Sequence, residues 1–212
     1  MNMITLTIIA INVILSIKGF NDAVFFEKYK FNIGAIQRGE KIRLLTSGFL
    51  HVDVSHLFLN MLTLYFFADV VIHYLGNIGF VLVYLGSLIL GNLVSLFFHK
   101  KEYYYSAVGA SGAVMGVLYA SILLQPDMML GLFFLIPIPA YIFGIGYLLY
   151  SIYGMKNRMD NIGHDAHFGG AMGGYFITLI INPWVITQHT LMTILLVIPI
   201  IILFVLQRKG KL

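Results

Sequence analysis

Residues 55–75 read SHLFLNMLTLYFFADVVIHYL, an apolar run long enough to cross a lipid bilayer as one helix. His56 and Asn60 stand near its start with i, i+4 spacing, so they share one face of that helix. Polar side chains inside a membrane helix are costly to bury and usually serve a function. This stretch therefore predicts a membrane-spanning fold with a polar site below one membrane face.

The composition of the whole chain supports a membrane fold. Its 212 residues are 59% hydrophobic and 10% charged, with a mean hydropathy of +0.90. Soluble domains carry about 25% charged residues, so we exclude an ordinary soluble domain and expect a polytopic membrane protein. The sequence contains no cysteine, which excludes disulfides, thiol nucleophiles and thiolate metal sites. The net charge of +4, without a dense basic run, argues against nucleic-acid binding, and the N-terminus predicts no removable signal peptide.

Seven apolar stretches predict an all-α bundle that forms a single domain over residues 1–212. The expected helices cover residues 3–17, 55–75, 78–98, 107–124, 130–153, 166–181 and 191–206. Turn-forming residues separate most of these stretches, as at Gly76 and Asn77. Pro137 and Pro139 predict a kink or break inside the fifth helix, because proline removes a helical hydrogen bond.

The connection over residues 18–54 is much longer than the others. It mixes aromatic and charged residues, as in the run FFEKYKF at residues 25–31. Long loops are usually functional or disordered, and the aromatic side chains here argue against disorder. Aromatic residues also favour the membrane–water interface. We therefore expect this segment, called the first loop below, to pack as ordered structure, partly within the interface.

Three polar groups lie near the starts of the second, fourth and sixth expected helices. They are His56 with Asn60, then Ser111, and then His164, Asp165 and His167. Even-numbered helices all begin at one membrane face, so these groups are expected at a similar depth. Gly112 and Gly116 on the fourth helix, with Gly170 and Gly174 on the sixth, would let the two helices approach closely.

Such an approach would bring Ser111 within hydrogen-bond reach of His167, as a base requires to activate a hydroxyl nucleophile. His56 and Asn60 could then supply donors for an oxyanion. Other interpretations stay open. The Gly-Ala-Ser-Gly run is typical of helix packing, the His56–Asn60 pair might only link helices, and a small transporter or channel would also need a polar cluster. A further alternative is a metal site formed by four histidines, His51, His56, His164 and His167, although no HExxH motif accompanies them.

Taken together, these motifs resemble the rhomboid family of intramembrane serine proteases over roughly residues 41–183. The strongest stretch is RLLTSGFLH at residues 43–51, which continues through HLFLNM at 56–61. It is followed by GASG at 109–112 and AHFGG at 166–170. Each piece alone is a weak signal, whereas their order, spacing and placement on even-numbered helices make the combination specific.

The resemblance implies a role for each matching polar residue. Ser111 would be the nucleophile and His167 the general base of a dyad without a carboxylate. His56 and Asn60, with the backbone N–H of Ser111, would form the oxyanion hole. His164 is a second candidate for the base, but the Ala-His-x-Gly-Gly pattern belongs to His167.

The resemblance also implies the surroundings of the site. Gly109 would keep the wall beside Ser111 clear, and Gly112, Met115 and Gly170 would line or support the substrate cavity. The fold would be a six-helix transmembrane bundle with a seventh C-terminal helix at residues 191–206. The fifth helix would be the mobile element beside which a substrate enters from the bilayer.

The implied activity is endopeptidase cleavage of transmembrane protein substrates near small or helix-destabilising residues, without metal or cofactor. The alternative is a rhomboid-like protein that binds or chaperones membrane proteins without cleaving them, although such proteins typically lack the Ser or the His. Three positions depart from the usual family pattern. Ile42 replaces a common Trp, Ile72 a common acidic residue, and Met115 an aromatic that often stacks on the catalytic His. Neither the substrate's identity nor the oligomeric state is predicted.

The basic residues predict an orientation in what we expect to be the cell (inner) membrane. If all seven helices span, all 13 Lys and Arg residues fall on the first-loop face: Lys18, Lys28, Lys30, Arg38, Lys41, Arg43, Lys100, Lys101, Lys156, Arg158, Arg208, Lys209 and Lys211. Basic residues favour the cytoplasmic side, so the opening at Ser111 is expected to face the cytoplasm. This expectation conflicts with the resemblance, because the better-known bacterial rhomboids open to the outside.

Overall fold

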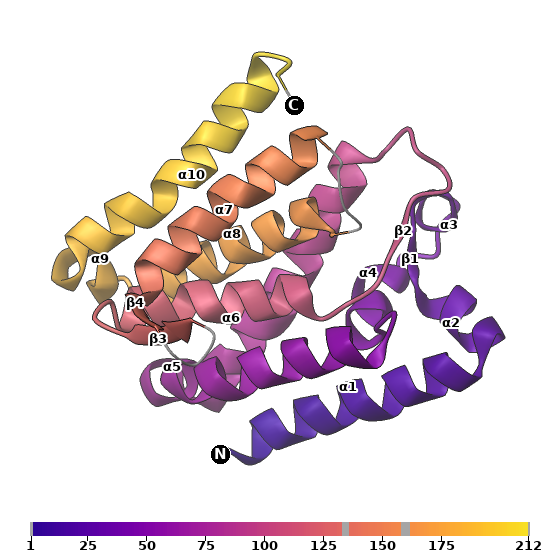
Figure 1. Ribbon diagram of the computed structural model, residues 1–212, viewed down its shortest axis with the longest axis horizontal. Helices are drawn as coiled ribbons and strands as arrows, with labels where there is room; N and C mark the ends of the chain where they lie inside the picture. Colours follow the sequence, from indigo (N-terminus) through magenta and orange to yellow (C-terminus); the bar gives the residue numbers. More distant parts are fainter. Residues whose placement is uncertain (1, 133–135, 158–161, 212) are drawn as a thin grey trace.

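The computed structural model describes residues 2–132, 136–157 and 162–211. Within these ranges the chain forms a bundle of long helices that run roughly parallel or antiparallel (Figure 1). Helices α6 and α8 lie in the middle, with α1 along one edge and α10 along the opposite edge. The long helices are α1 (Met3–Asn21), α5 (Val54–Phe98), α6 (Ser111–Leu124), α7 (Ala140–Asn157), α8 (His164–Ile181) and α10 (Thr190–Arg208).

Short elements occupy the two ends of the bundle (Figure 1). The short helices are α2 (Ala23–Tyr29), α3 (Ile33–Gln37), α4 (Arg43–Thr46), the 3-10 helix η1 (Ser47–Phe49) and α9 (Trp184–Gln188). The strands are β1 (Phe31–Asn32), β2 (Ser106–Ala107), β3 (Met129–Leu132) and β4 (Ile136–Pro139), which pair as two antiparallel ribbons, β1 with β2 and β3 with β4.

The expected polytopic all-α class is confirmed. Among the described helices, α1, α5 and α10 are long and apolar enough to cross a membrane, and α6 is a shorter apolar helix. The second and third expected helices both lie within α5, and the chain reverses between them at Gly76, where φ is 69° and ψ is 178°. Glycine tolerates this positive φ without a Cβ clash. The seventh helix predicted at residues 191–206 is α10.

Two expected helices begin later than predicted. The helix predicted at residues 107–124 starts at Ser111, because residues 106–107 pair with the first loop and Gly109 takes a positive φ of 135°. The helix predicted at 130–153 starts at Ala140. The preceding segment contributes strands β3 and β4, where Pro137 and Pro139 are accommodated because a narrow ribbon tolerates missing N–H donors. The predicted break at these prolines is thus a change from ribbon to helix.

The first loop is ordered, as expected. Phe31, Ile33 and Ile36 are buried together as a small apolar cluster. The Arg43 guanidinium ties the loop's turns to one another: it donates to the backbone oxygens of Glu27 (2.7 Å) and Lys30 (2.9 Å) and pairs with the Glu40 carboxylate. A planar guanidinium offers five donors in fixed directions, which suits it to bridging several chain segments.

Helices α6 and α8 meet through backbone contacts at glycines. A Cβ added at Gly170 would overlap the backbone of Gly112, and a Cβ added at Gly174 would overlap the backbone of Gly116. These four residues are the glycines predicted to bring the two helices together. Helix α8 also approaches α5 closely, since a Cβ at Gly91 would lie 2.6 Å from the Ala166 carbonyl oxygen. The start of α8 is therefore fixed against two neighbouring helices.

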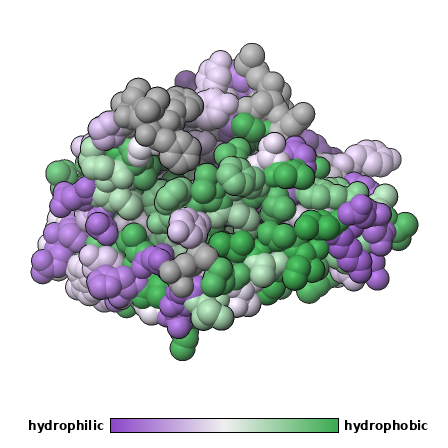
Figure 2. Space-filling model, turned by 60° about the horizontal axis from the view of Figure 1, so that its bottom comes forward, coloured by the Kyte–Doolittle hydropathy of each residue, from purple (hydrophilic) through white to green (hydrophobic). Residues whose placement is uncertain are grey.

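The outer surface is suited to lipid. Figure 2 shows one face of the molecule, on which hydrophobic residues form a broad central band and hydrophilic residues gather mainly toward its left and right ends. Many large apolar side chains are exposed along the long helices, including Ile14, Phe58, Ile78 and Ile201. A continuous apolar surface of this extent is unfavourable in water and favourable in a bilayer.

The glycine contacts generate a stability prediction. Gly170→Ala places a methyl group into the Gly112 backbone, so we expect a loss of about 1–3 kcal/mol in unfolding free energy. The matched control is Gly146→Ala on α7, where a Cβ meets nothing within 4 Å; its expected effect is below about 1 kcal/mol. Unfolding of both variants in detergent measures the difference, and equal stabilities would contradict the close approach of α6 and α8.

Candidate active site

Ser111 and His167 form a direct contact between α6 and α8. Ser111 is the first residue of α6, and His167 lies in the first turn of α8. The Ser111 Oγ and His167 Nε2 atoms are 2.5 Å apart. His167 is buried, with 8% of its surface exposed, while Ser111 is partly exposed. The glycine contacts described above set this separation, because they fix the two helix starts side by side.

Gly109 opens a space between Ser111 and His56. A Cβ added at Gly109 would lie 2.9 Å from His56 Nε2 and 3.6 Å from Ser111 Oγ. A side chain at position 109 would therefore press against His56, and the glycine keeps the space between His56 and Ser111 clear. Asn60 is buried one turn below, where its Nδ2 donates to the His56 backbone oxygen at 3.0 Å. An amide nitrogen has two hydrogens, and this bond uses one of them.

Two residues of the first loop hold the backbone just before Ser111. The Ser47 backbone oxygen accepts a hydrogen bond from the Gly109 N–H at 3.0 Å. The Ser47 hydroxyl in turn accepts from the side chain of Asn92 on α5 at 3.1 Å. His51 Nε2 accepts from the Ala110 N–H at 3.4 Å. The stretch RLLTSGFLH thus acts through its polar atoms on the GASG segment, a link that sequence spacing alone does not reveal.

His51 is fully buried in a network that fixes its tautomer. Because Nε2 accepts from Ala110, the proton of the neutral ring is on Nδ1, which lies 2.8 Å from the Ser16 hydroxyl. Ser16 then donates to the Phe49 backbone oxygen at 3.1 Å. Burial, and to a lesser degree the neighbouring His56 ring, lower the pKa of His51 from 6.5 to about 3. His51 therefore stays neutral at physiological pH.

A charged cluster fixes the beginning of α8. His99, at the end of α5, has Nε2 3.5 Å from an Asp165 carboxylate oxygen and Nδ1 2.9 Å from a Glu102 carboxylate oxygen. Its ring stacks on Tyr105 with a centroid separation of 3.6 Å. Burial alone lowers the pKa of His99, but Asp165 and Glu102 together raise it above its ordinary value. Asp165 precedes His167 by two residues, so the cluster anchors the turn that carries His167.

A tyrosine from α7 reaches the other side of the His167 ring. The Tyr147 hydroxyl oxygen lies 2.6 Å from His167 Nδ1. Sequence reasoning did not single out Tyr147, because it is one aromatic among several in an apolar stretch. One sequence feature pointed in this direction: Met115 stands where the family often has an aromatic residue next to the histidine, so that residue had to be supplied from elsewhere. Met115 itself is buried in the core. His167 therefore has partners on α6 and on α7.

The other candidate histidine lies elsewhere. The His164 ring faces α7, where a Cβ added at Gly154 would overlap it and where Tyr150 packs edge-on at a centroid distance of 5.1 Å. His51 and His56 pack against each other at 5.0 Å. Within the part of the chain that the structure describes, no group of three or more His, Cys, Asp or Glu side chains is arranged to hold a metal ion.

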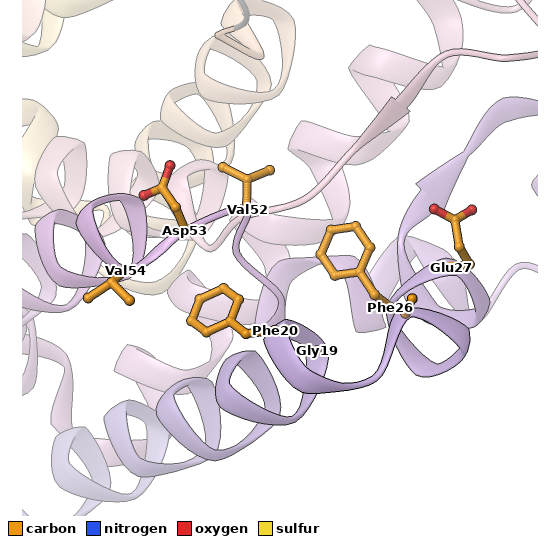
Figure 3. Close-up of a pocket in the computed structure, with 8 residues that line it drawn as sticks. Gly19, Phe20, Phe26, Glu27, Val52, Asp53 and Val54 are labelled. Carbon is orange, nitrogen blue, oxygen red and sulfur yellow. The ribbon is translucent and has the colours of Figure 1, made fainter.

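A separate cavity of about 530 Å³ opens between the end of α1, helix α2 and the start of α5 (Figure 3). Phe20, Phe26, Val52 and Val54 give it a mainly apolar lining. Neither Ser111 nor His167 contributes to this lining. Asp53, at its edge, connects it to the site, because the Asp53 carboxylate accepts from the His56 N–H at 2.7 Å and caps α5.

The fold and the site together define a polytopic membrane bundle with a serine–histidine pair at the starts of two packed helices. Comparison with known proteins supplies the family. The family model described as the Rhomboid domain matches residues 38–184. The chain therefore belongs to the rhomboid family.

Individual relatives agree with this assignment. The chain is 29% identical over 167 residues to "RHOMBOID-like protein 12, mitochondrial" of Arabidopsis thaliana, covering 72% of this chain and 50% of that protein. It is 35% identical over 141 residues to "Rhomboid protease GluP" of Bacillus subtilis, covering 66% and 26% respectively. It is 34% identical over 142 residues to the mouse "Presenilin-associated rhomboid-like protein, mitochondrial", covering 64% and 37%. The matched region thus spans half or less of each of these relatives.

The depressed pKa of His51 generates a pH prediction. Unfolded His51 binds a proton below its ordinary pKa of 6.5, whereas folded His51 does so only near 3. Its contribution to stability is therefore present above pH 6.5 and is lost as the pH falls toward 3, by up to about 1.4 kcal/mol per pH unit. The stability difference between wild type and His51→Gln should shrink accordingly in detergent unfolding. If the stability difference between the two proteins stays constant between pH 6.5 and pH 3, the neutral, buried state of the His51 ring is contradicted.

Proposed function

We propose that the protein is an intramembrane serine endopeptidase that cleaves transmembrane segments of other membrane proteins. The observation that carries the proposal is the 2.5 Å separation between Ser111 Oγ and His167 Nε2. A hydroxyl is a weak nucleophile at its ordinary pKa, and an adjacent base within hydrogen-bond reach activates it. Membership of the rhomboid family and the likeness to a bacterial rhomboid protease support the same chemistry.

The proposed reaction proceeds through an acyl-enzyme. Ser111 Oγ attacks the scissile carbonyl carbon while His167 Nε2 takes the hydroxyl proton. The tetrahedral intermediate collapses, the C–N bond breaks, and His167 returns the proton to the departing amine. Water then attacks the ester with His167 again as base, which releases a carboxylic acid and regenerates Ser111.

Negative charge on the tetrahedral oxygen needs donors that are already in place. The space beside Gly109 is bordered by His56 Nε2 and by Ser111. The backbone N–H of Ser111 belongs to the first turn of α6, where N–H groups have no partner within the helix. Asn60 lies one turn further along α5 with one amide hydrogen beyond the bond to His56. We assign these three residues to the oxyanion hole.

Hydrolysis in a membrane requires water, and the site lies near one end of the bundle. Ser111 and His167 stand at helix starts on the first-loop face, beside the β1–β2 ribbon. A substrate helix must unwind to expose its carbonyl, which favours small or helix-destabilising residues at the cleavage point. A purely binding relative is the alternative function, but it gives no reason for a serine and a histidine to be held in hydrogen-bond contact.

The direct test compares wild type with Ser111→Ala on single-span reporter proteins carrying small residues near the membrane face. We expect cleavage by wild type and a loss of roughly 10³-fold or more in the variant, because removing the nucleophile leaves only the remaining site. Ser121→Ala, which alters a buried serine on the far half of α6, is the matched control. Equal cleavage by wild type and Ser111→Ala would contradict the proposal.

In this proposal the protein lies in the cell membrane, and its active site opens toward the cytoplasm. The described Lys and Arg residues lie in the first loop, at the ends of α1, α5 and α7, or at the end of α10, all on the first-loop face (Figure 1). Basic residues favour the cytoplasmic side of a membrane. Several relatives carry mitochondrial names, whereas the rhomboid protease GluP is bacterial.

Single cysteines test this orientation, because the chain contains no native cysteine. Lys101→Cys lies on the first-loop face, and Asn77→Cys lies beside the turn at Gly76 in the middle of α5, where the chain reverses at the opposite end of the bundle. With a membrane-impermeant maleimide, we expect Asn77→Cys to react in intact cells and Lys101→Cys to react only after permeabilisation. The reverse pattern would place the Ser111 opening outside the cell.

A further inference from the structure

Tyr147 approaches the catalytic pair from a third helix. Its hydroxyl oxygen lies 2.6 Å from Nδ1 of His167, on the opposite side of the ring from Ser111. The two rings have centroids 5.8 Å apart and are tilted by 33°. This geometry is a hydrogen bond to the edge of the imidazole rather than a face-to-face stack. The three side chains come from α6, α8 and α7, so they form a chain of polar contacts across the bundle.

The proposed reaction determines which atom carries the proton in this chain. His167 can accept the Ser111 proton only if Nε2 is unprotonated, which places the ring proton of the neutral histidine on Nδ1. The Nδ1–H then donates to the Tyr147 oxygen. In the opposite tautomer the Tyr147 hydroxyl would donate to Nδ1, and the protonated Nε2 could not act as a base. In the active tautomer the Tyr147 oxygen thus takes the place of the carboxylate in a Ser-His-Asp triad, although a hydroxyl can also donate, so the tautomer follows from the reaction and not from Tyr147 alone.

The position of Tyr147 is fixed by contacts between α7 and α6. Three residues before Tyr147, the Gly144 backbone oxygen accepts a hydrogen bond from the Tyr119 hydroxyl of α6 at 2.8 Å. A Cβ added at Gly144 would lie 2.8 Å from Ile122, so the two helices are in close contact there. The Tyr147 ring also stacks on Phe143 at a centroid distance of 5.9 Å. These contacts hold the hydroxyl at the level of His167.

We propose that Tyr147 is a positioning residue that orients His167 and accepts from its Nδ1–H in the active tautomer. This inference rests on the proposed protease function and adds to it a residue outside the Ser–His pair. When His167 becomes positively charged, its Nδ1–H keeps an acceptor in the Tyr147 oxygen. Hydrogen bonds weaken steeply beyond about 3.2 Å, so an outward displacement of α7 by about 1 Å removes this support. The strength of the base therefore depends on the placement of α7.

The test measures how fast Ser111 reacts with a fluorophosphonate, because this reaction needs no known substrate. The Ser111 oxygen forms a bond to phosphorus, fluoride leaves, and His167 takes the hydroxyl proton. We expect Tyr147→Phe to lower the rate constant of labelling by about tenfold, as expected for loss of one hydrogen bond to a charged group. Reporter cleavage should show a lower kcat with KM unchanged. Tyr153→Phe, an exposed tyrosine on the same helix, is the matched control and should behave as wild type.

The outcomes separate this inference from the function on which it rests. If wild type and Tyr147→Phe are labelled at equal rates, the role of Tyr147 is overturned and the protease proposal stands. A wild type that neither reacts nor cleaves would overturn both. Nitrogen NMR of the histidines in the wild-type protein gives a second readout that does not depend on the variant's folding. It should show His167 protonated on Nδ1, and protonation on Nε2 in the resting protein would overturn the inference.

Discussion

The close backbone contact between α6 and α8 is the constraint on which the rest of the site depends. Gly112 and Gly116 face Gly170 and Gly174 so closely that a single methyl group at either α8 position would overlap the α6 backbone. No larger pair of residues lets two helices approach to this distance. The contact places the first residue of α6 beside the first turn of α8, and Ser111 and His167 meet there.

Hydrogen bonds and ion pairs hold the chain segments on either side of the contact that the glycines make possible. The first loop holds the backbone before Ser111 through Ser47 and His51, and the His99 cluster holds the turn before His167 through Asp165. Both supports lie near the same end of the bundle, where the long helices meet the ordered first loop (Figure 1). Polar groups are costly within a bilayer, and their concentration at one end lets the rest of each helix remain apolar.

Much of this arrangement could be predicted from the sequence, because apolar length and glycine spacing follow simple rules. The stretch at residues 55–75 follows from its apolar length, the turn at Gly76 from its turn-forming residues, and the contact between the fourth and sixth expected helices from the spacing of their glycines. The β3–β4 ribbon could not be predicted, because apolar residues with two prolines fit a kinked helix as well as a strand pair. Tyr147 was missed for a different reason: its role depends on where α7 docks on α6, and that is a tertiary contact without a local pattern.

Chemical reactivity at Ser111 is the property that separates a protease from a binding protein with the same fold. The most direct measurement is mass spectrometry of the purified protein after reaction with an isocoumarin, with the modified peptide sequenced. We expect one adduct on Ser111 and a large loss of that adduct in His167→Ala. An unmodified Ser111, or an adduct formed equally well without His167, would contradict a serine nucleophile activated by His167.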